Sequence, residues 1–195
     1  MKYFFVTVLL LAFLSGNAQQ KNCPQPTDSL FMPYFTNKAL KKVEDLGFML
    51  NIISDKETDP LDANTAIDNA VKLFIDEEAT VQVSNVSDTT YRSKFKVREY
   101  LKRVKALKYD KVKIEWTSIQ YVSDLRLGDD GNYHGVISYE QLFTGFIDGN
   151  IVYRDLTKKD TLVVVKRQAI ENEGKTFICW EVLLSDIQVT QTIKR

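Results

Sequence analysis

Few residues in this chain have the type and spacing that chemistry requires. His134 is the only histidine, so a serine–histidine triad of the usual kind cannot be assembled. The surrounding sequence, GNYHGV, lacks the pattern of a nucleophile elbow. One histidine also cannot complete a zinc site, because neither cysteine has ligand-type neighbours in the sequence. We therefore expect His134 to lie on a strand near a turn.

The acidic cluster Asp129-Asp130-Gly131 invites comparison with a calcium-binding loop. If Gly131 took the sixth place of such a loop, Arg126 and Ile137 would take the first and twelfth. Neither side chain can bind calcium there, so the motif fails. The glycine-rich motifs GxGxxG and GxxxxGK[ST], which hold dinucleotides and phosphates, do not occur. We therefore expect neither a metal nor a cofactor.

Acidic and basic residues balance at 26 each, which gives no reason to expect nucleic acid or an anionic membrane as a partner. The segment Arg92–Lys113 is locally basic, with ten lysines and arginines against Glu99 and Asp110. We interpret it as the solvated face of a helix followed by the start of a strand. The acidic residues between Asp55 and Glu78 could instead pair with this segment in a second molecule, which would give a homodimer.

Cys23 and Cys179 are the two cysteines of the chain. In an oxidising compartment, a disulfide bond between them would tie the N-terminal segment to a late strand. Alternatively, Cys179 is a small buried residue within FICWEV and Cys23 is a free thiol. Both interpretations stay open, because the geometry of the fold decides between them.

The N-terminus has the pattern of a secretory signal peptide. Lys2 is followed by the apolar run Phe4–Leu14, and small residues precede a cleavage position after Ala18. A membrane-spanning helix needs about 20 apolar residues, which is more than this run supplies. We predict that residues 1–18 are a signal peptide and that the mature chain is exported, soluble and without a membrane span, in the periplasm or outside the cell.

The rest of the chain is expected to form one domain. Residues 19–36 contain three of the four prolines and are predicted to be an extended lead-in. Residues 37–195 are predicted to be the domain itself. Its first part should contain three helices, because apolar residues recur at helical spacing over 38–54, from about 62 to the acidic turn Asp76–Glu78, and over 94–107.

The acidic turn is expected to end the second helix, since carboxylates at a helix C-terminus are disfavoured by the helix dipole and should face water. Residues 79–85 alternate in polarity and predict a short strand. An alternating strand from Lys111 to Leu127 changes phase at Thr117-Ser118, which indicates a bulge.

Further strands are predicted over 133–146, 160–170 and 176–189, with 151–156 as a short extended connection. Three N-terminal helices packed on a strongly bent antiparallel sheet would make an α+β fold. A curved sheet closed by helices leaves a cone whose wide end can stay open as a cavity. The candidate pocket-lining residues are the large aromatic ones on the strands: Trp116, Tyr121, Tyr139, Phe143 and Trp180.

Two segments carry a family resemblance. AIDNAVKLFIDEEATVQVSN, residues 66–85, resembles the second helix and acidic elbow of the nuclear transport factor 2-like, or cystatin-like cone, superfamily, whose ketosteroid isomerases and SnoaL-type polyketide cyclases read LF-acid-acid-A-T. KFKVREYLKRVKAL, residues 94–107, is similar to the helix that follows. The resemblance covers residues 37–189 and implies a cone-shaped domain.

The catalytic residues of the isomerases do not carry over. The resemblance places their general-base aspartate at Val83, which cannot accept a proton. It places their tyrosine donor near Phe48 or Met49, and neither side chain can donate. Dehydratase-type members rely on paired histidines, whereas this chain has one histidine.

We therefore expect a non-enzymatic binding or scaffolding module for an unknown protein partner or a small apolar ligand. The resemblance also implies homodimerisation through the outer face of the sheet. The alternative is a divergent lyase, isomerase or cyclase that uses Tyr121, Tyr139, His134 or a carboxylate elsewhere. A cone with a polar group of shifted pKa at its floor would favour the enzyme, and a cone filled by aromatic side chains would oppose it.

Overall fold

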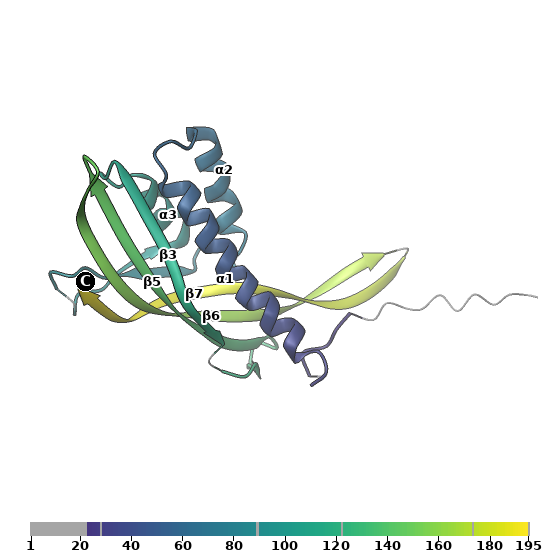
Figure 1. Cartoon of the computed structure of the whole chain (residues 1–195). Coiled ribbons are helices and arrows are strands. Elements are labelled where there is room, and N and C mark those ends of the chain that lie inside the picture. Colours follow the sequence, from purple (N-terminus) through teal and green to yellow (C-terminus); the bar gives the residue numbers. More distant parts are fainter. Residues whose placement is uncertain (1–22, 28, 89, 122, 173, 195) are drawn as a thin grey trace, which may run out of the picture.

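The computed structural model describes residues 23–27, 29–88, 90–121, 123–172 and 174–194 (Figure 1). The predicted signal peptide, residues 1–18, lies outside the described residues, so it stays a prediction. No helix in the described ranges combines the length and apolar character that crossing a membrane requires.

Within the described residues, the chain forms the helices α1 (Met32–Ser54), α2 (Pro60–Val71) and α3 (Val97–Lys105). The start of α1 lies inside the predicted lead-in 19–36, so that part of the prediction was wrong. Pro33 occupies the first turn of the helix, where the missing N–H costs no hydrogen bond. Asp59 caps α2 by accepting a hydrogen bond from the Leu61 N–H.

The acidic elbow after α2 is built by its own carboxylates. The Asp76 side chain accepts hydrogen bonds from the backbone N–H groups of Glu78, at 2.9 Å, and Ala79, at 3.0 Å, which closes the turn. Arg98 of α3 forms an ion pair with Glu77, at 2.8 Å, and Lys96 forms one with Glu78, at 2.7 Å. The exposed acidic and basic segments are therefore paired within one chain.

The described strands form one sheet in the order β2-β1-β7-β6-β5-β3, with β4 paired to β5. Their bounds are β1 (Thr80–Val83), β2 (Ser93–Lys96), β3 (Lys111–Tyr121), β4 (Arg126–Leu127), β5 (Tyr133–Ile147), β6 (Asn150–Asn172) and β7 (Lys175–Lys194). The chain is thus α+β, as predicted, and the long strands bend across the helices without closing into a barrel (Figure 1).

The sheet is mixed and not purely antiparallel, which corrects the prediction. Strand β1 pairs in parallel with β7. The segment before β1 already runs along β7, because the Ile75 N–H donates to the Leu184 carbonyl and the Leu184 N–H donates to the Leu73 carbonyl, both at 2.8 Å. The side chain of Asp186 on β7 then accepts from the Thr80 N–H at 2.8 Å, which holds the start of β1 in place.

Two predicted element boundaries were wrong, and one predicted bulge was correct. Residues 93–96 form β2, where the third helix was expected to begin, because they pair with β1. Strand β6 is continuous from Asn150 to Asn172, through the predicted connection. The predicted bulge is confirmed, since the β3–β5 register shifts between Thr117 and Gln120 and Ser118 has a φ of 52°.

The main core lies between α1 and the sheet. Trp116 stacks on Tyr139 with ring centroids 4.3 Å apart and an interplanar angle of 15°. Gly47 of α1 lies directly against this indole, since a Cβ atom at Gly47 would be 3.2 Å from the Trp116 ring. The close approach of α1 to the sheet therefore depends on the absence of a side chain at Gly47.

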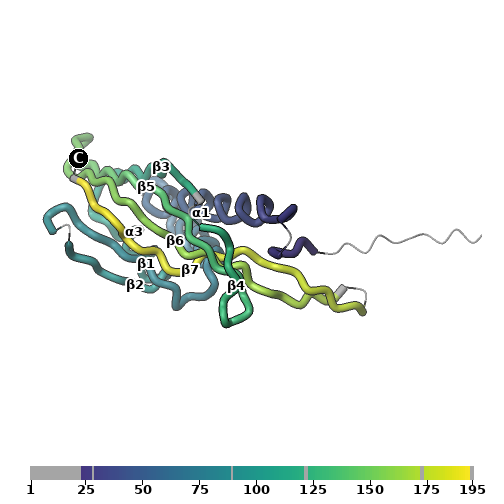
Figure 2. The backbone as a smooth tube through the Cα atoms, turned by 90° about the horizontal axis from the view of Figure 1, so that it is seen from below, coloured from purple at the N-terminus to yellow at the C-terminus, as the bar shows by residue number. Residues whose placement is uncertain are grey.

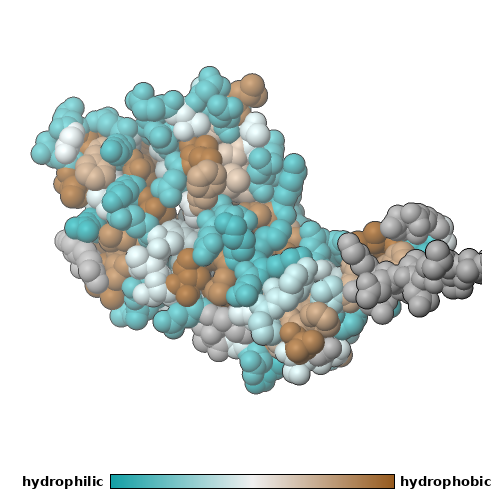
Figure 3. All heavy atoms as spheres, turned by 45° about the vertical axis from the view of Figure 1, so that its right-hand side comes forward, coloured by the Kyte–Doolittle hydropathy of each residue, from teal (hydrophilic) through white to brown (hydrophobic). Residues whose placement is uncertain are grey.

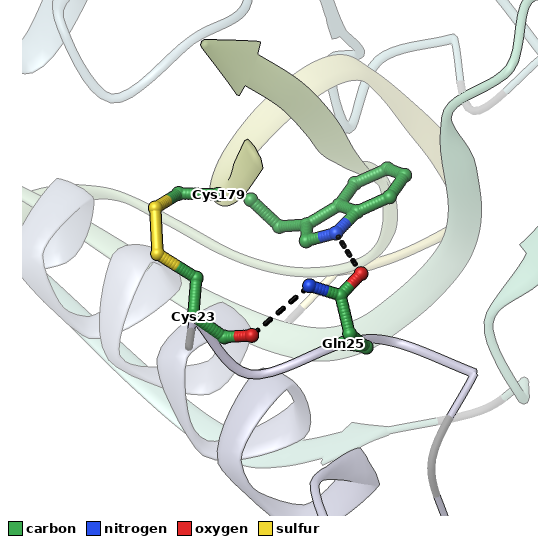
Figure 4. The surroundings of a disulfide bond; sticks show 4 residues. Cys23, Gln25 and Cys179 are labelled. Atoms are coloured by element: carbon green, nitrogen blue, oxygen red, sulfur yellow. Dashed lines mark hydrogen bonds between the residues drawn. A yellow bond between two sulfur atoms is a disulfide. The ribbon is translucent and has the colours of Figure 1, made fainter. Parts of the chain in front are cut away.

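The β6–β7 hairpin extends beyond the helices in both views of the backbone (Figures 1 and 2). A disulfide bond between Cys23 and Cys179, with Cα atoms 5.1 Å apart, ties the N-terminal segment to this hairpin. The neighbouring Trp180 indole donates a hydrogen bond of 2.9 Å to the Gln25 side chain (Figure 4). The sequence left two interpretations open, and the structure contains the disulfide bond.

We expect the variant Cys23→Ser/Cys179→Ser to lose about 2–4 kcal/mol of unfolding free energy. The bridge joins residues 156 positions apart, so its loss releases a long loop in the unfolded chain. Urea unfolding of oxidised wild type and of the variant measures the difference. Equal midpoints and slopes for the two proteins would contradict the expectation.

Candidate functional site

A cavity of about 420 Å³ lies between α3, the β1–β2 pair and the strands β5 and β6. Its volume is in the range of small-molecule sites. Its lining residues are Val83, Ser84, Phe95, Tyr100, Arg103, Val104, Leu107, Tyr109, Gln141, Phe143, Tyr153, Asp155, Thr157 and Lys159. The cavity is thus mainly apolar and aromatic on the helix side, where Arg103 is the charged residue, and carries polar groups on the sheet.

The polar floor follows from the register of β5 and β6. Phe143 lies opposite Asp155, and Gln141 lies opposite Thr157. Since side chains alternate along a strand, Asp155, Thr157 and Lys159 all point to the same face as Gln141. The pairing therefore places a carboxyl group, a hydroxyl group, an amide and an amine on one surface beneath α3.

Three aromatic rings close one end of the cavity. The centroid of Tyr109 is 5.8 Å from that of Phe143 and 6.4 Å from that of Tyr153, and the last two are 5.7 Å apart. Tyr109 lies over Gly145, where an added Cβ atom would be 2.8 Å from the ring. Gly145 therefore lets this tyrosine lie close to the sheet and shape the end of the cavity.

Asp155 is a buried carboxyl group that is only partly satisfied. Its side chain accepts a hydrogen bond of 2.8 Å from the Tyr153 hydroxyl at Oδ2, while Oδ1 has no hydrogen-bond partner in the described part of the chain. Burial raises the pKa of Asp155, and the hydrogen bond from Tyr153 opposes this shift. The group can therefore accept a further donor or hold a proton more readily than an exposed aspartate.

Lys159 is buried at 3% exposure in the same cavity. Its Nζ atom donates to Gln141 Oε1 at 3.3 Å and lies 5.8 Å from the centre of the Tyr100 ring. Burial lowers the pKa of Lys159 to about 8, and the Asp155 carboxylate opposes this shift. The neutral form of this amine is therefore more populated near physiological pH than in an exposed lysine.

The predicted pocket residues are distributed over three places. Phe143 lines the cavity. Trp116 and Tyr139 stack in the core beneath α1, and Trp180 lies beside the disulfide (Figure 4). The side chain of Tyr121 lies outside the part of the structure that is described. The core and the disulfide region thus account for three of the large rings.

Val83 lines the cavity, at the position where the resemblance places the general base of the isomerases. It contributes apolar surface, whereas the buried carboxyl group and the buried amine of the cavity come from Asp155 and Lys159 on β6. His134 is not a lining residue; its Nε2 atom lies 2.9 Å from Asp130 in the turn that precedes β5.

Sequence reasoning missed Asp155 because it assigned 151–156 to a connection, and it missed Lys159 because it began the next strand at Asp160. The signal was present in the alternation of β6. Val163 and Val165 face the core, and the same period of two extends back through Thr161, Lys159, Thr157 and Asp155. Polar residues in phase with core valines indicate a buried polar site.

The site contains the kinds of groups that ligand binding and proton transfer require. Its amine and its carboxyl group both have pKa values shifted toward neutrality by burial, which is the condition for acid–base chemistry near pH 7. Among the described residues, no three His, Cys, Asp or Glu side chains gather as metal ligands.

We expect Lys159→Met to raise the unfolding free energy by about 3 kcal/mol at pH 7. The pKa of Lys159 falls from an ordinary 10.5 to about 8 on folding, so the unfolded chain holds this proton more tightly. The resulting destabilisation is nearly complete below pH 8 and disappears as the pH rises to 10.5. Urea unfolding between pH 7 and 10.5 measures the difference between variant and wild type.

The matched control is Lys158→Met, one residue away on the exposed face of the same strand. It should change stability little at any of these pH values. A difference between Lys159→Met and wild type that stayed constant with pH would contradict the lowered pKa.

Comparisons of this chain with protein-family models, with curated proteins and with solved structures found no match.

Proposed function

We propose that this protein is an exported binding module that holds a small amphipathic ligand in the cavity beneath α3. The observation that carries the proposal is the cavity of about 420 Å³ whose apolar walls face incompletely satisfied polar groups. A ligand with an apolar body and a polar end matches this arrangement, because each part then meets a complementary surface.

The proposal includes the nuclear transport factor 2-like cone as the fold. Its support is the order of elements, in which helices and the acidic elbow precede long bent strands (Figure 1). The position of the cavity, between the sheet and the third helix, agrees with the open end of such a cone. Export rests on the N-terminal sequence pattern and is compatible with the disulfide bond, since disulfides persist in oxidising compartments.

A ligand explains the site better than a broad protein interface does. The lining residues surround a cavity of about 420 Å³, which suits a small ligand better than a flat protein surface does. On the face shown in Figure 3, hydrophobic residues form small groups among hydrophilic ones. Such a surface lacks the large continuous apolar patch that marks many protein interfaces.

We expect the mature chain to bind N-phenyl-1-naphthylamine, a neutral fluorescent probe with an apolar body and one polar group. The variant Val83→Trp/Leu107→Trp fills part of the cavity with indole rings. Its affinity for the probe should fall about tenfold or more, which corresponds to about 1.4 kcal/mol. Fluorescence titration measures both affinities.

The matched control is Val152→Trp/Leu127→Trp, which makes the same two exchanges at positions that are 52% and 63% exposed. The control should bind the probe like wild type. Equal losses in the two variants, or a wild-type protein that does not bind, would overturn the binding function.

A second candidate is a divergent lyase, isomerase or cyclase, which is favoured by one observation. The cavity contains an amine and a carboxyl group whose pKa values both move toward neutrality. These groups are Lys159 and Asp155. The sequence had suggested Tyr121, Tyr139, His134 or an unplaced carboxylate for this role, and Asp155 is a carboxylate of that last kind.

If the site catalyses proton transfer, the α-protons of cyclohexanone should exchange with D₂O faster in the presence of the protein. We expect wild type to exceed Lys159→Met at least about tenfold, since positioned acid–base groups contribute 10²–10⁴-fold. Proton NMR follows the exchange. The control Lys158→Met should exchange as fast as wild type. Equal exchange rates for wild type, Lys158→Met and Lys159→Met would contradict the enzymatic candidate and leave the binding function intact.

A further inference from the structure

The lysine in the cavity lies on a strand that is paired on both sides. Lys159 lies in the middle of β6, where it is paired with Tyr139 of β5 and with Val189 of β7. Strands on both sides fix the direction of the side chain. At 3% exposure, the amine cannot reach bulk water without leaving the cavity.

The amine has few partners for a charged group. An ammonium ion carries three N–H donors, and the one hydrogen bond that Nζ makes to a described residue goes to Gln141 at 3.3 Å. Within the described part of the chain Lys159 forms no ion pair, although the Asp155 carboxylate is near enough to oppose the fall in its pKa. A neutral amine suits this environment better, because it can donate to Gln141 and direct its lone pair into the cavity.

The groups that face this amine come from three elements. Asp155 belongs to the same strand, Gln141 extends from β5, and Tyr100 and Arg103 extend from α3. An anionic ligand would meet the Arg103 guanidinium as well as the Asp155 carboxyl group, so charge alone does not select it. A neutral electrophile needs neither charge, and Asp155 is the acid that can supply or accept a proton beside it.

We propose that Lys159 is a nucleophile that forms an imine with a small aldehyde or ketone bound in the cavity. The inference rests on the proposed binding function and names the chemical class of the ligand. The apolar part of the carbonyl compound would lie against Phe95, Val104 and Leu107, which line the helix side of the cavity.

The reaction is balanced without any further reagent. The lone pair of Nζ forms a bond to the carbonyl carbon, and the electron pair of the C=O π bond moves to oxygen, which takes up a proton. The nitrogen loses a proton to give a neutral carbinolamine. Protonation of its hydroxyl group by an acid such as Asp155 releases water, and a second proton leaves nitrogen. The net change is amine plus carbonyl to imine plus water.

The test uses three ligands that share one ring system: 2-naphthaldehyde, 2-naphthalenemethanol and 2-naphthoate. Each is first titrated against bound N-phenyl-1-naphthylamine to establish whether it enters the cavity. The folded mature protein is then incubated with the aldehyde and sodium cyanoborohydride, which reduces an imine to a stable secondary amine. Intact-mass analysis and peptide mapping locate the label.

We expect one naphthylmethyl group, mainly on Lys159. At pH 7.5 the neutral fraction of an amine with a pKa of about 8 exceeds that of an ordinary lysine on the order of 100-fold. Lys159 should therefore be labelled at least about tenfold faster than the average exposed lysine. The label should disappear in Lys159→Met and persist in Lys158→Met, with circular dichroism confirming that both variants are folded.

Two results would overturn the imine and separate it from the binding function. If the alcohol and the aldehyde both displace the probe but Lys159 is not labelled, the cavity binds ligands without covalent chemistry. If the carboxylate displaces the probe most strongly and no adduct forms, Lys159 is an ammonium anchor for anions. Failure of wild type to bind the probe or any of the three ligands would overturn both proposals.

Discussion

The pairing of β6 with β5 on one side and with β7 on the other is the constraint on which the rest of the structure depends. A strand held along both edges cannot rotate its side chains away from the core. Asp155 and Lys159 are therefore buried beneath α3, although burying ionisable groups is unfavourable. The cavity leaves space beside these two side chains, whose hydrogen-bonding capacity the protein itself does not fully use.

The position of α3, which covers the cavity, depends in turn on the acidic elbow. Tyr100 and Val104 reach the cavity from α3, and the start of α3 is held by Arg98, which contacts Asp68 at 2.6 Å and Glu77 at 2.8 Å. Exposed ion pairs contribute little individually, but these contacts connect α2, the elbow and α3. Their contribution is to fix the position of the helix more than to stabilise the fold.

Much of this architecture could be predicted from the sequence, because the local periodicity of apolar residues indicates it. The three helices, the α+β class and the bulge at Thr117-Ser118 follow from patterns of two and of 3.6 residues. The parallel pairing of β1 with β7 could not be predicted, since it joins segments far apart in the chain. The site was missed for a different reason: Asp155 and Lys159 are charged residues in a buried strand, which polarity alone assigns to a loop. Val83, which the resemblance singled out, lines the cavity and supplies apolar surface there.

The bond between Cys23 and Cys179 closes the chain into a covalent ring that includes α1, α2, α3 and strands β1–β6. A protease that cuts the connection between α1 and α2, or any other exposed loop within the ring, leaves all the pieces in one molecule. The last part of β7 lies outside the ring but is paired with β6. After a single cut of this kind the two pieces stay covalently joined, and the molecule gains only the mass of one water until the disulfide is reduced.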